Sequence, residues 1–269
     1  MKQLNWYQIF GNTHTIPEGS TVTPTDDVQI LLHCADIWDK SYTTLNELLA
    51  DTDTLLAVIN SENAVNYLVR STTWASGVCA DSTAMSYIGL NNYCANTLLA
   101  DATWCEAICN SEYFESVLNV KVPTMTGATT PSGEAFAMSA DTPNQCYPWK
   151  AFDKNTSTHW YSQWNVNPTN GYIGYKFTSA VKCVAMHYVC SDIAANHKPL
   201  GVKVQGSNDN VTYTDLASAT WVKDNNPEWV YFSDNTSTYQ YYRMLISGGT
   251  TTNQQAGATE LQFYGREDV

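Results

Sequence analysis

The fourteen residues from Ala151 to Trp164 read AFDKNTSTHWYSQW. Polar side chains such as Asp153 fill the first half, and the large aromatic residues Trp160, Tyr161 and Trp164 fill the second. This mixture has neither the 3.6-residue period of an amphipathic helix nor the alternation of a half-buried strand. We therefore interpret the stretch as an ordered loop. Loops held on a rigid scaffold often carry binding groups, so the search for a site starts here.

Short strand-like runs separated by polar turns surround this loop and continue to the end of the chain. They cover residues 134–139, 171–177, 181–189, 201–205, 211–216, 229–232, 240–246 and 260–264. Many short strands with turn signals between them are typical of an antiparallel sandwich or jelly roll. The sequence therefore predicts a β-sandwich over residues 134–269.

Five segments in this order resemble a discoidin, or coagulation-factor type C, domain. Within that superfamily the chain is most similar to the family 32 carbohydrate-binding modules. The segments are AFDKNTSTHW (151–160), GYIGYKF (171–177), VKVQGSNDNVTY (202–213), YQYYRMLI (239–246) and ELQFYG (260–265). The resemblance covers residues 134–269 and implies a galactose-binding-like jelly roll. The identity of the ligand varies widely in this family and does not follow.

The resemblance also implies a structural calcium ion under the first of these segments. The matching positions are Asp153, Asn155, Thr158 and Glu260. They supply the hard oxygen donors that Ca²⁺ prefers. Lys154 stands where the family commonly has glycine, which strains the turn but leaves the side-chain donors in place. The alternative is a loop closed by turns of its own, without a metal.

For sugar binding, the resemblance implies a site on the apical loops, with an aromatic platform and a few directed polar groups. The candidate ligand-binding residues are Tyr161, Gln163, Trp164, Ser191 and His197. Two positions depart from a galactose-type site. Tyr161 stands where a histidine is expected, and Cys190 or Ser191 stands where an arginine is often found. The alternative for each aromatic residue is packing in the core or at its rim.

A ten-residue repeat of eight units precedes the sandwich, over residues 41–119. The first position is always a helix N-cap residue, and the eighth is always aliphatic. The first positions are Ser41, Asp51, Ser61, Ser71, Asp81, Asn91, Asp101 and Ser111, and the eighth are Leu48, Val58, Leu68, Val78, Ile88, Leu98, Ile108 and Leu118. In one continuous helix the apolar stripe would rotate by about 80° per unit. We therefore predict an array of short helices wound as a small solenoid, which must stack or oligomerise.

The remaining segments are predicted from local signals. Residues 1–40 are interpreted as an N-terminal anchor with a helix over about 26–38, and residues 120–133, which hold two prolines and two glycines, as a linker. Cys79, Cys94 and Cys105, like Cys109, fall on the apolar stripe of the repeat, where a free thiol packs as a small hydrophobe. Reduced cysteines indicate assembly in a cytosol.

Composition narrows the range of functions. The net charge of -13 disfavours nucleic acid and anionic membranes as partners. Only 14% of the residues are charged, and such a polar but weakly charged surface suits neutral ligands. The N-terminus lacks the apolar core of an export signal, so we expect neither export nor insertion into a membrane. HExxH, GxSxG, P-loop and dinucleotide-binding motifs are absent, so we expect no enzyme.

The first hypothesis is a non-catalytic virion surface protein, a bacteriophage head or tail fibre or a decoration protein, made in the host cytoplasm. Its sandwich would bind a cell-surface glycan, its N-terminal segment would contact other virion proteins, and the chain would form a homo-oligomer. The second hypothesis is a structural virion protein whose sandwich only contacts proteins. The third is an accessory module of a secreted glycosidase, which would place the chain outside the cell or on its surface.

Overall fold

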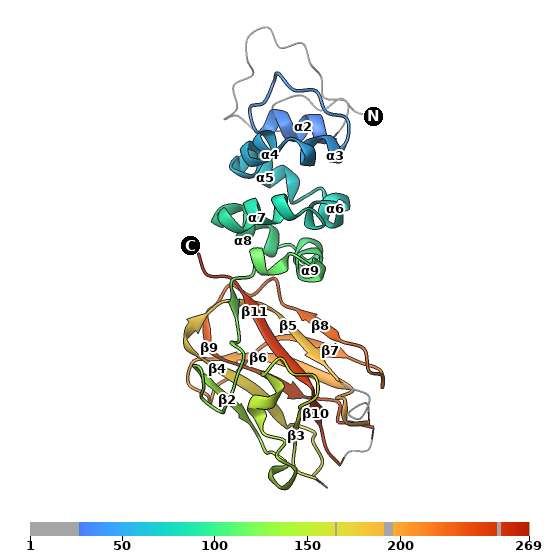
Figure 1. Ribbon diagram of the computed structural model, residues 1–269, viewed down its shortest axis with the longest axis vertical. Helices are drawn as coiled ribbons and strands as arrows, with labels where there is room; N and C mark the ends of the chain where they lie inside the picture. The colour runs from blue at the N-terminus through green and yellow to red at the C-terminus, as the bar shows by residue number, and fades with distance from the viewer. Residues whose placement is uncertain (1–26, 165, 191–195, 252–253, 269) are drawn as a thin grey trace. The chain divides into compact units, whose positions relative to one another are not determined.

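The computed structural model describes residues 27–164, 166–190, 196–251 and 254–268. They fall into two compact units, the first ending at Val117 and the second running from Leu118 to Asp268 (Figure 1). Most of the predicted N-terminal anchor, residues 1–26, lies outside the described residues. None of the described helices is long and apolar enough to cross a membrane.

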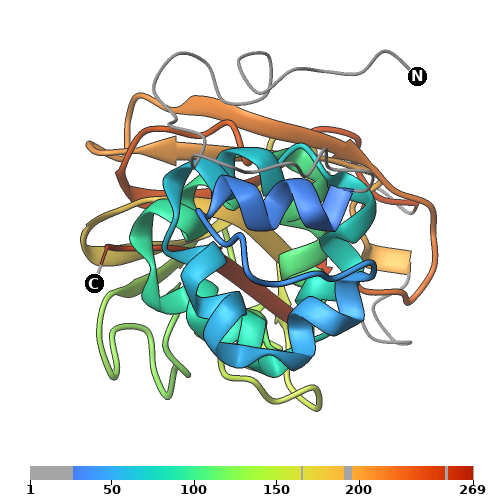
Figure 2. The same ribbon diagram turned by 90° about the horizontal axis from the view of Figure 1, so that it is seen from above.

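The first unit consists of short helices joined by tight connections, and Figures 1 and 2 show separate segments in place of one rod. The first helix ends four residues before the predicted C-terminal end, because Asp36 has a left-handed backbone (φ 61°). The α-helices are α2 (Asp27–Cys34), α3 (Leu45–Ala50), α4 (Thr52–Ile59), α5 (Glu62–Leu68), α6 (Ala75–Cys79), α7 (Ser82–Leu90), α8 (Asn92–Leu99) and α9 (Ala102–Asn110).

Side-chain caps set where most of these helices begin. In five of them the residue at the first position of the ten-residue unit accepts a hydrogen bond from a backbone N–H in the first turn, which satisfies a donor that the helix leaves unpaired. These residues are Asp51, Ser61, Asp81, Asn91 and Asp101.

The first, fourth and eighth units differ from the predicted pattern. In the first, Thr44 replaces Ser41 as the cap, because Thr44 and Glu47 form a capping box. Ser71 makes no side-chain cap bond and precedes a 3-10 turn, η2 (Thr72–Trp74). After Ser111 the chain forms only the 3-10 turn η3 (Phe114–Ser116).

Helices three units apart pack against each other: α2 on α5, α4 on α7, α5 on α8 and α6 on α9. Hydrogen bonds from polar side chains also join helices that are far apart in sequence. Ser61 Oγ donates to the carbonyl of Cys34 over 3.1 Å, and Trp104 Nε1 donates to that of Val69 over 3.0 Å. Every eighth-position residue is buried, and all eight cysteines are buried as free thiols. A single short helix could not bury this stripe, so each helix depends on its neighbours.

The second unit is an antiparallel sandwich, as the sequence predicted. One sheet has the strand order β1-β11-β5-β8 and the other β2-β4-β9-β6-β7, while β3 and β10 form a separate ribbon. The strands are β1 (Val120–Lys121), β2 (Glu134–Ala137), β3 (Trp160–Tyr161), β4 (Tyr172–Val181), β5 (Cys183–Val189), β6 (Gly201–Ser207), β7 (Thr214–Thr220), β8 (Glu228–Tyr231), β9 (Tyr239–Ile246), β10 (Gly257–Ala258) and β11 (Glu260–Gly265).

The core of the sandwich lies between the two sheets and is rich in aromatic residues. Tyr175 and Tyr242 belong to one sheet and Tyr188 and Phe263 to the other, and all four are buried in this core. The ring centroids of Tyr242 and Phe263 are 5.8 Å apart. Rings of this size bury a large apolar area, so they supply much of the drive to fold.

The segment predicted as a linker, residues 120–133, is part of the sandwich. Val120 pairs with Gly265 and Lys121 with Tyr264, which makes β1 the edge strand of the four-stranded sheet. Val122 and Met125 are buried in the core. The alternation of Val120, Lys121 and Val122 is a short strand signal, but the prolines and glycines that follow it had favoured a linker.

Candidate functional site

The strand β3 places aromatic side chains on two sides of the chain. Trp160 is buried in the core, where its indole Nε1 donates to the carbonyl of Ser139 over 2.9 Å. Because successive side chains of a strand point to opposite faces, His159 and Tyr161 share the other side. Gly257 pairs with Tyr161 across the ribbon. A Cβ on Gly257 would lie 2.2 Å from a ring carbon of Tyr161, so only glycine leaves room for the ring.

Four rings form a continuous aromatic cluster: His159, Tyr161, His197 and Trp164. The centroids of His159 and Tyr161 are 4.2 Å apart, those of Tyr161 and His197 5.2 Å, and those of His197 and Trp164 5.9 Å. Tyr161 is buried, whereas 51% of Trp164 is exposed. The cluster therefore runs from the core to an indole that stands in solvent.

The polar atoms of this aromatic cluster are uncharged at neutral pH. The Tyr161 hydroxyl and His197 Nδ1 are buried and have no hydrogen-bond partner among the described residues. Burial lowers the pKa of His159 and His197, and it raises the pKa of Tyr161 to about 12. At neutral pH the cluster thus holds neutral imidazoles and a protonated phenol, which can donate to and accept from ligand hydroxyls.

Of the other two predicted ligand-binding residues, Gln163 and Ser191, the structure describes only Gln163. Gln163 is exposed next to the aromatic cluster, and its backbone N–H donates to Ser139 Oγ over 3.1 Å. Ser191 lies outside the described residues. His159 was not among the ligand-binding residues predicted from the sequence. The signal was its position two residues before Tyr161, on the same side of a strand.

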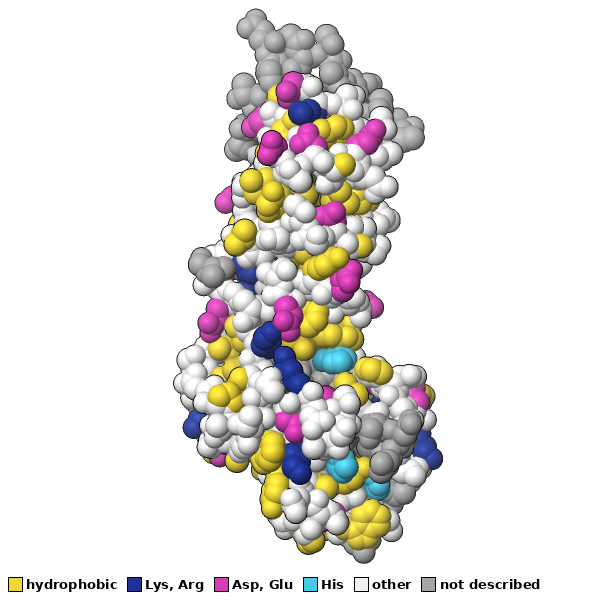
Figure 3. All heavy atoms as spheres, viewed as in Figure 1, with side chains coloured by type: hydrophobic (Ala, Val, Ile, Leu, Met, Phe, Trp, Pro, Cys, Tyr) yellow, Lys and Arg dark blue, Asp and Glu magenta, His cyan; other side chains and the backbone are white. Residues whose placement is uncertain are grey.

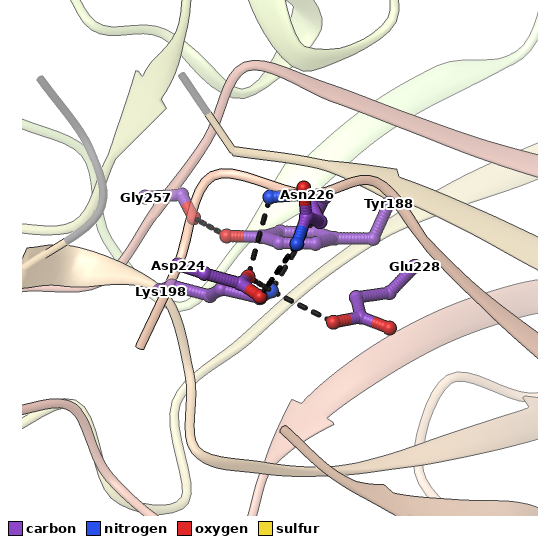
Figure 4. Close-up of polar contacts among 6 residues, drawn as sticks. All are labelled: Tyr188, Lys198, Asp224, Asn226, Glu228 and Gly257. Carbon is purple, nitrogen blue, oxygen red and sulfur yellow. Dashed lines mark hydrogen bonds and ion pairs between the residues drawn. The ribbon is translucent and has the colours of Figure 1, made fainter. Parts of the chain in front are cut away.

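A buried lysine fixes the segment that carries His197 (Figure 4). Lys198 has no exposed surface, and its Nζ contacts Asp224 Oδ1 at 2.5 Å and Glu228 Oε1 at 2.8 Å. Nζ also donates to the carbonyl of Asn226 over 3.3 Å and lies 5.6 Å from the centroid of Trp221. A charge without contact to water requires such a full set of partners.

The opposite side of the aromatic cluster is fixed as well. The hydroxyl of Tyr188 donates to the carbonyl of Gly257 over 2.6 Å (Figure 4). Gly257 in turn lies against the Tyr161 ring. Tyr188 is itself buried and stacks on Trp221 with the ring centroids 4.9 Å apart. Gly257 is thus connected to Lys198 through Tyr188 and Trp221, and His197 is the sequence neighbour of Lys198. The rings of the aromatic cluster are therefore held in place before any ligand binds.

Replacing Lys198 with methionine tests this anchor. The variant keeps the aliphatic chain but leaves Asp224 and Glu228 without their shared cation, so we expect the melting temperature of the sandwich to fall by about 5 °C. The matched control is Lys203→Met, since Lys203 pairs with Asp215 at 2.6 Å but both side chains are largely exposed. Exposed pairs contribute little. Equal shifts in the two variants, measured by calorimetry, would contradict the anchor.

Hydrogen bonds join Asp153, Asn155 and Thr158 within the loop and link the loop to Glu260 of β11. Thr158 Oγ1 donates to Asp153 Oδ2 over 2.7 Å, and the N–H of Asn155 donates to Asp153 Oδ1 over 3.0 Å. The N–H of Lys154 donates to Glu260 Oε2 over 3.3 Å. Lys154 has φ 55°, the left-handed conformation in which glycine is unstrained, so its departure from the family pattern is accommodated at some cost.

Glu260 tests whether a cation fits there. Its side chain is buried, and Oε1 has no hydrogen-bond partner among the described residues. Burial and then the charge of Asp153 raise the pKa of Glu260 to about 8. A divalent cation would relieve both effects. The possible donors here are the carboxylates of Asp153 and Glu260 with neutral oxygens around them. Among the described residues there is no group of three or more His, Cys, Asp or Glu that could hold a metal ion. The set fits a hard cation such as Ca²⁺.

Comparison with known proteins found similarity in solved structures alone, since no protein-family model and no curated protein matches the chain. A family 32 carbohydrate-binding module from Clostridium perfringens, solved with GalNAc-β-1,3-galactose, is 18% identical, with a TM-score of 0.44, and the match covers 49% of this chain and 95% of the module. The family 32 module of Clostridium perfringens NanJ, solved with galactose, is 21% identical, with a TM-score of 0.43 and coverage of 49% and 93%. A pectin-binding module is 17% identical, with a TM-score of 0.40 and coverage of 50% and 91%.

Proposed function

We propose that the sandwich binds a neutral carbohydrate at the aromatic cluster and performs no chemistry on it. The observation that carries this proposal is the solvent-exposed indole of Trp164, which continues into the neutral, unpartnered polar atoms of Tyr161 and His197. A pyranose ring presents an apolar C–H face to an aromatic plane and hydroxyls around its edge. An aromatic platform with donors and acceptors beside it matches both.

Only 14% of the residues are charged, which supports a neutral ligand. On the face that Figure 3 shows, charged side chains are scattered over a mainly uncharged polar surface. The proposed calcium ion would be structural. Asp153, Asn155, Thr158 and Glu260 would hold it, and its positive charge would join the loop to β11. The residues of the aromatic cluster that follow this loop directly in sequence would then be held in place by the ion.

Replacing Trp164 with alanine tests the proposed function. We expect the affinity of the full chain for its glycan to fall at least tenfold, because truncation of an aromatic hot spot typically costs about 2 kcal/mol and a tenfold change needs about 1.4 kcal/mol. The melting temperature should change little, since half of the indole is exposed. Binding is measured on a glycan array and then by calorimetry with the glycan that scores highest. The control is Tyr93→Ala, an exposed aromatic residue of the helical unit.

Three outcomes separate the alternatives. Unchanged binding by Trp164→Ala would move the site elsewhere on the sandwich. A large fall in melting temperature would make Trp164 a core residue. No binding by the parent chain to any glycan would favour the second hypothesis, in which the sandwich contacts proteins only.

The biological setting remains a proposal. A virion surface protein that displays the sandwich to host glycans and an accessory module of a glycosidase are both compatible with a carbohydrate-binding site. The helical unit, with its stacked short helices, would in the first case carry the contacts of a homo-oligomer. Light scattering of the purified full chain tests the predicted oligomer directly.

A further inference from the structure

A second cluster of side chains lies on the outer face of the five-stranded sheet and shares no residue with the aromatic cluster. Strand register aligns Phe136, Gly174, Arg243, Gln205 and Asp215 in one row across β2, β4, β9, β6 and β7. The neighbours of Arg243 along β9, Tyr242 and Met244, point into the core and are buried. Because side chains alternate along a strand, the row itself points outward.

The guanidinium of Arg243, at the centre of this row, is fixed in orientation by its neighbours. Its guanidinium carbon lies 3.5 Å from the ring centroid of Tyr213 and 4.7 Å from that of Tyr172. Its Nε donates to Gln205 Oε1 over 2.8 Å, and Gln205 Nε2 donates to Asp215 Oδ1 over 2.5 Å. Two rings and a chain of hydrogen bonds fix the plane of the guanidinium, so little entropy is lost when it binds a partner.

Aromatic residues flank the arginine on its other side. The ring of Phe136 lies 6.1 Å from the rings of Tyr172 and Tyr241, and Lys176 Nζ lies 5.4 Å from the Tyr241 centroid. These rings are all partly exposed. Gly174 allows the close approach, since a Cβ there would lie 2.7 Å from Phe136 Cζ and 2.8 Å from Arg243 Cβ. The face thus combines flat apolar rings with a fixed cation.

The charge of this face is opposite to that of the chain. It carries the cations Lys176, Lys203 and Arg243 and the carboxylates Asp215 and Glu134, three against two, so its net charge is +1. The whole chain carries -13. Asp215 is already paired with Lys203 at 2.6 Å. An anion is therefore attracted to this face and repelled by most of the remaining surface.

We propose that this sheet face is a second binding surface, for an acidic carbohydrate whose carboxylate meets the Arg243 guanidinium while its sugar rings lie on Phe136 and Tyr241. A planar guanidinium fork matches a carboxylate in a bidentate pair, and the flanking rings take the C–H faces of the neighbouring sugar units. This surface is separate from the loop site and does not depend on it.

Hexagalacturonate is the probe, with a neutral galactan hexasaccharide as its comparison, and calorimetry on the full chain at low salt is the measurement. We expect the parent chain to bind hexagalacturonate, and Arg243→Gln to weaken that binding at least tenfold. Lys223→Gln, which removes an exposed charge outside this face, should leave the affinity unchanged within twofold. Trp164→Ala should also leave it unchanged, which keeps this test distinct from that of the loop site.

Folding is controlled by the melting temperature and by a second variant. Phe136→Leu keeps an apolar side chain but removes the ring, and we expect a loss of at least threefold in affinity. The proposal is overturned if the parent chain does not bind hexagalacturonate, or if folded Arg243→Gln and Phe136→Leu both bind it as the parent does. Loss of hexagalacturonate binding in Trp164→Ala would also overturn it, because the acidic sugar would then occupy the loop site.

Discussion

Leu68→Asp is expected to lower the free energy of unfolding of the helical unit by about 4 kcal/mol, the size of effect that burial of an unpaired charge produces. Leu68 ends α5 and is 3% exposed. It is an eighth-position residue, and α5 packs against both α2 and α8. A carboxylate there would either stay buried without a cation or force these helices apart.

The same unit provides a matched control two residues away. Asn66 is exposed, and its Oδ1 accepts a hydrogen bond from the Tyr93 hydroxyl over 3.0 Å. Asn66→Asp adds the same charge but keeps an oxygen acceptor, so we expect a change below about 0.5 kcal/mol. Urea unfolding followed by helical circular dichroism measures both variants. Equal effects at the two positions would contradict the ten-residue register.

The helix starts were predictable because a cap is a local interaction. Asp81, for example, accepts from the N–H of Ala84 over 2.8 Å, three residues along the same chain. The prediction was wrong at Ser41, where Thr44 caps α3 instead, and at Ser71 and Ser111, which do not cap an α-helix. The hydroxyl of Ser111 instead donates to the carbonyl of Cys79, which lies 32 residues earlier in the chain. Such a tertiary bond leaves no local mark in the sequence.

In the sandwich and its candidate site, too, local features could be predicted from the sequence and tertiary contacts could not. The loop motif and the strand runs predicted that Trp164 and His197 lie in loops of a sandwich. The resemblance predicted that Asp153 and Glu260 belong to one site. The anchoring role of Lys198 could not be predicted, because its carboxylate partners lie 26 and 30 residues further along the chain. Burial of Lys198 depends on the whole fold, whereas a lysine in sequence reads as exposed.

Glu260 leads to a second large effect, on the pH dependence of stability. The pKa of its carboxyl is about 8 in the folded chain, against 4.5 ordinarily. Between these values the folded state keeps a proton that the unfolded state has lost, so stability falls as the pH rises from about 4.5 to 8 and then levels off. The shift corresponds to a loss on the order of 3–5 kcal/mol. We expect this loss in the presence of a chelator.

Calcium should reverse that loss, because the ion binds only the ionised, folded site and adds about 2.7 kcal/mol at a concentration one hundred times its Kd. At pH 8 calcium should therefore raise the melting temperature, whereas at pH 5, where Glu260 is protonated, it should have little effect. Glu260→Gln removes the ionisable group but keeps its shape, so the variant should lose both the pH dependence and the response to calcium. Melting curves at pH 5 and pH 8, each with chelator and with calcium, measure the four states. A parent chain that melts at the same temperature in all four would contradict both the raised pKa of Glu260 and the proposed cation, since one free carboxylate oxygen beside Asp153 is the physical basis of each.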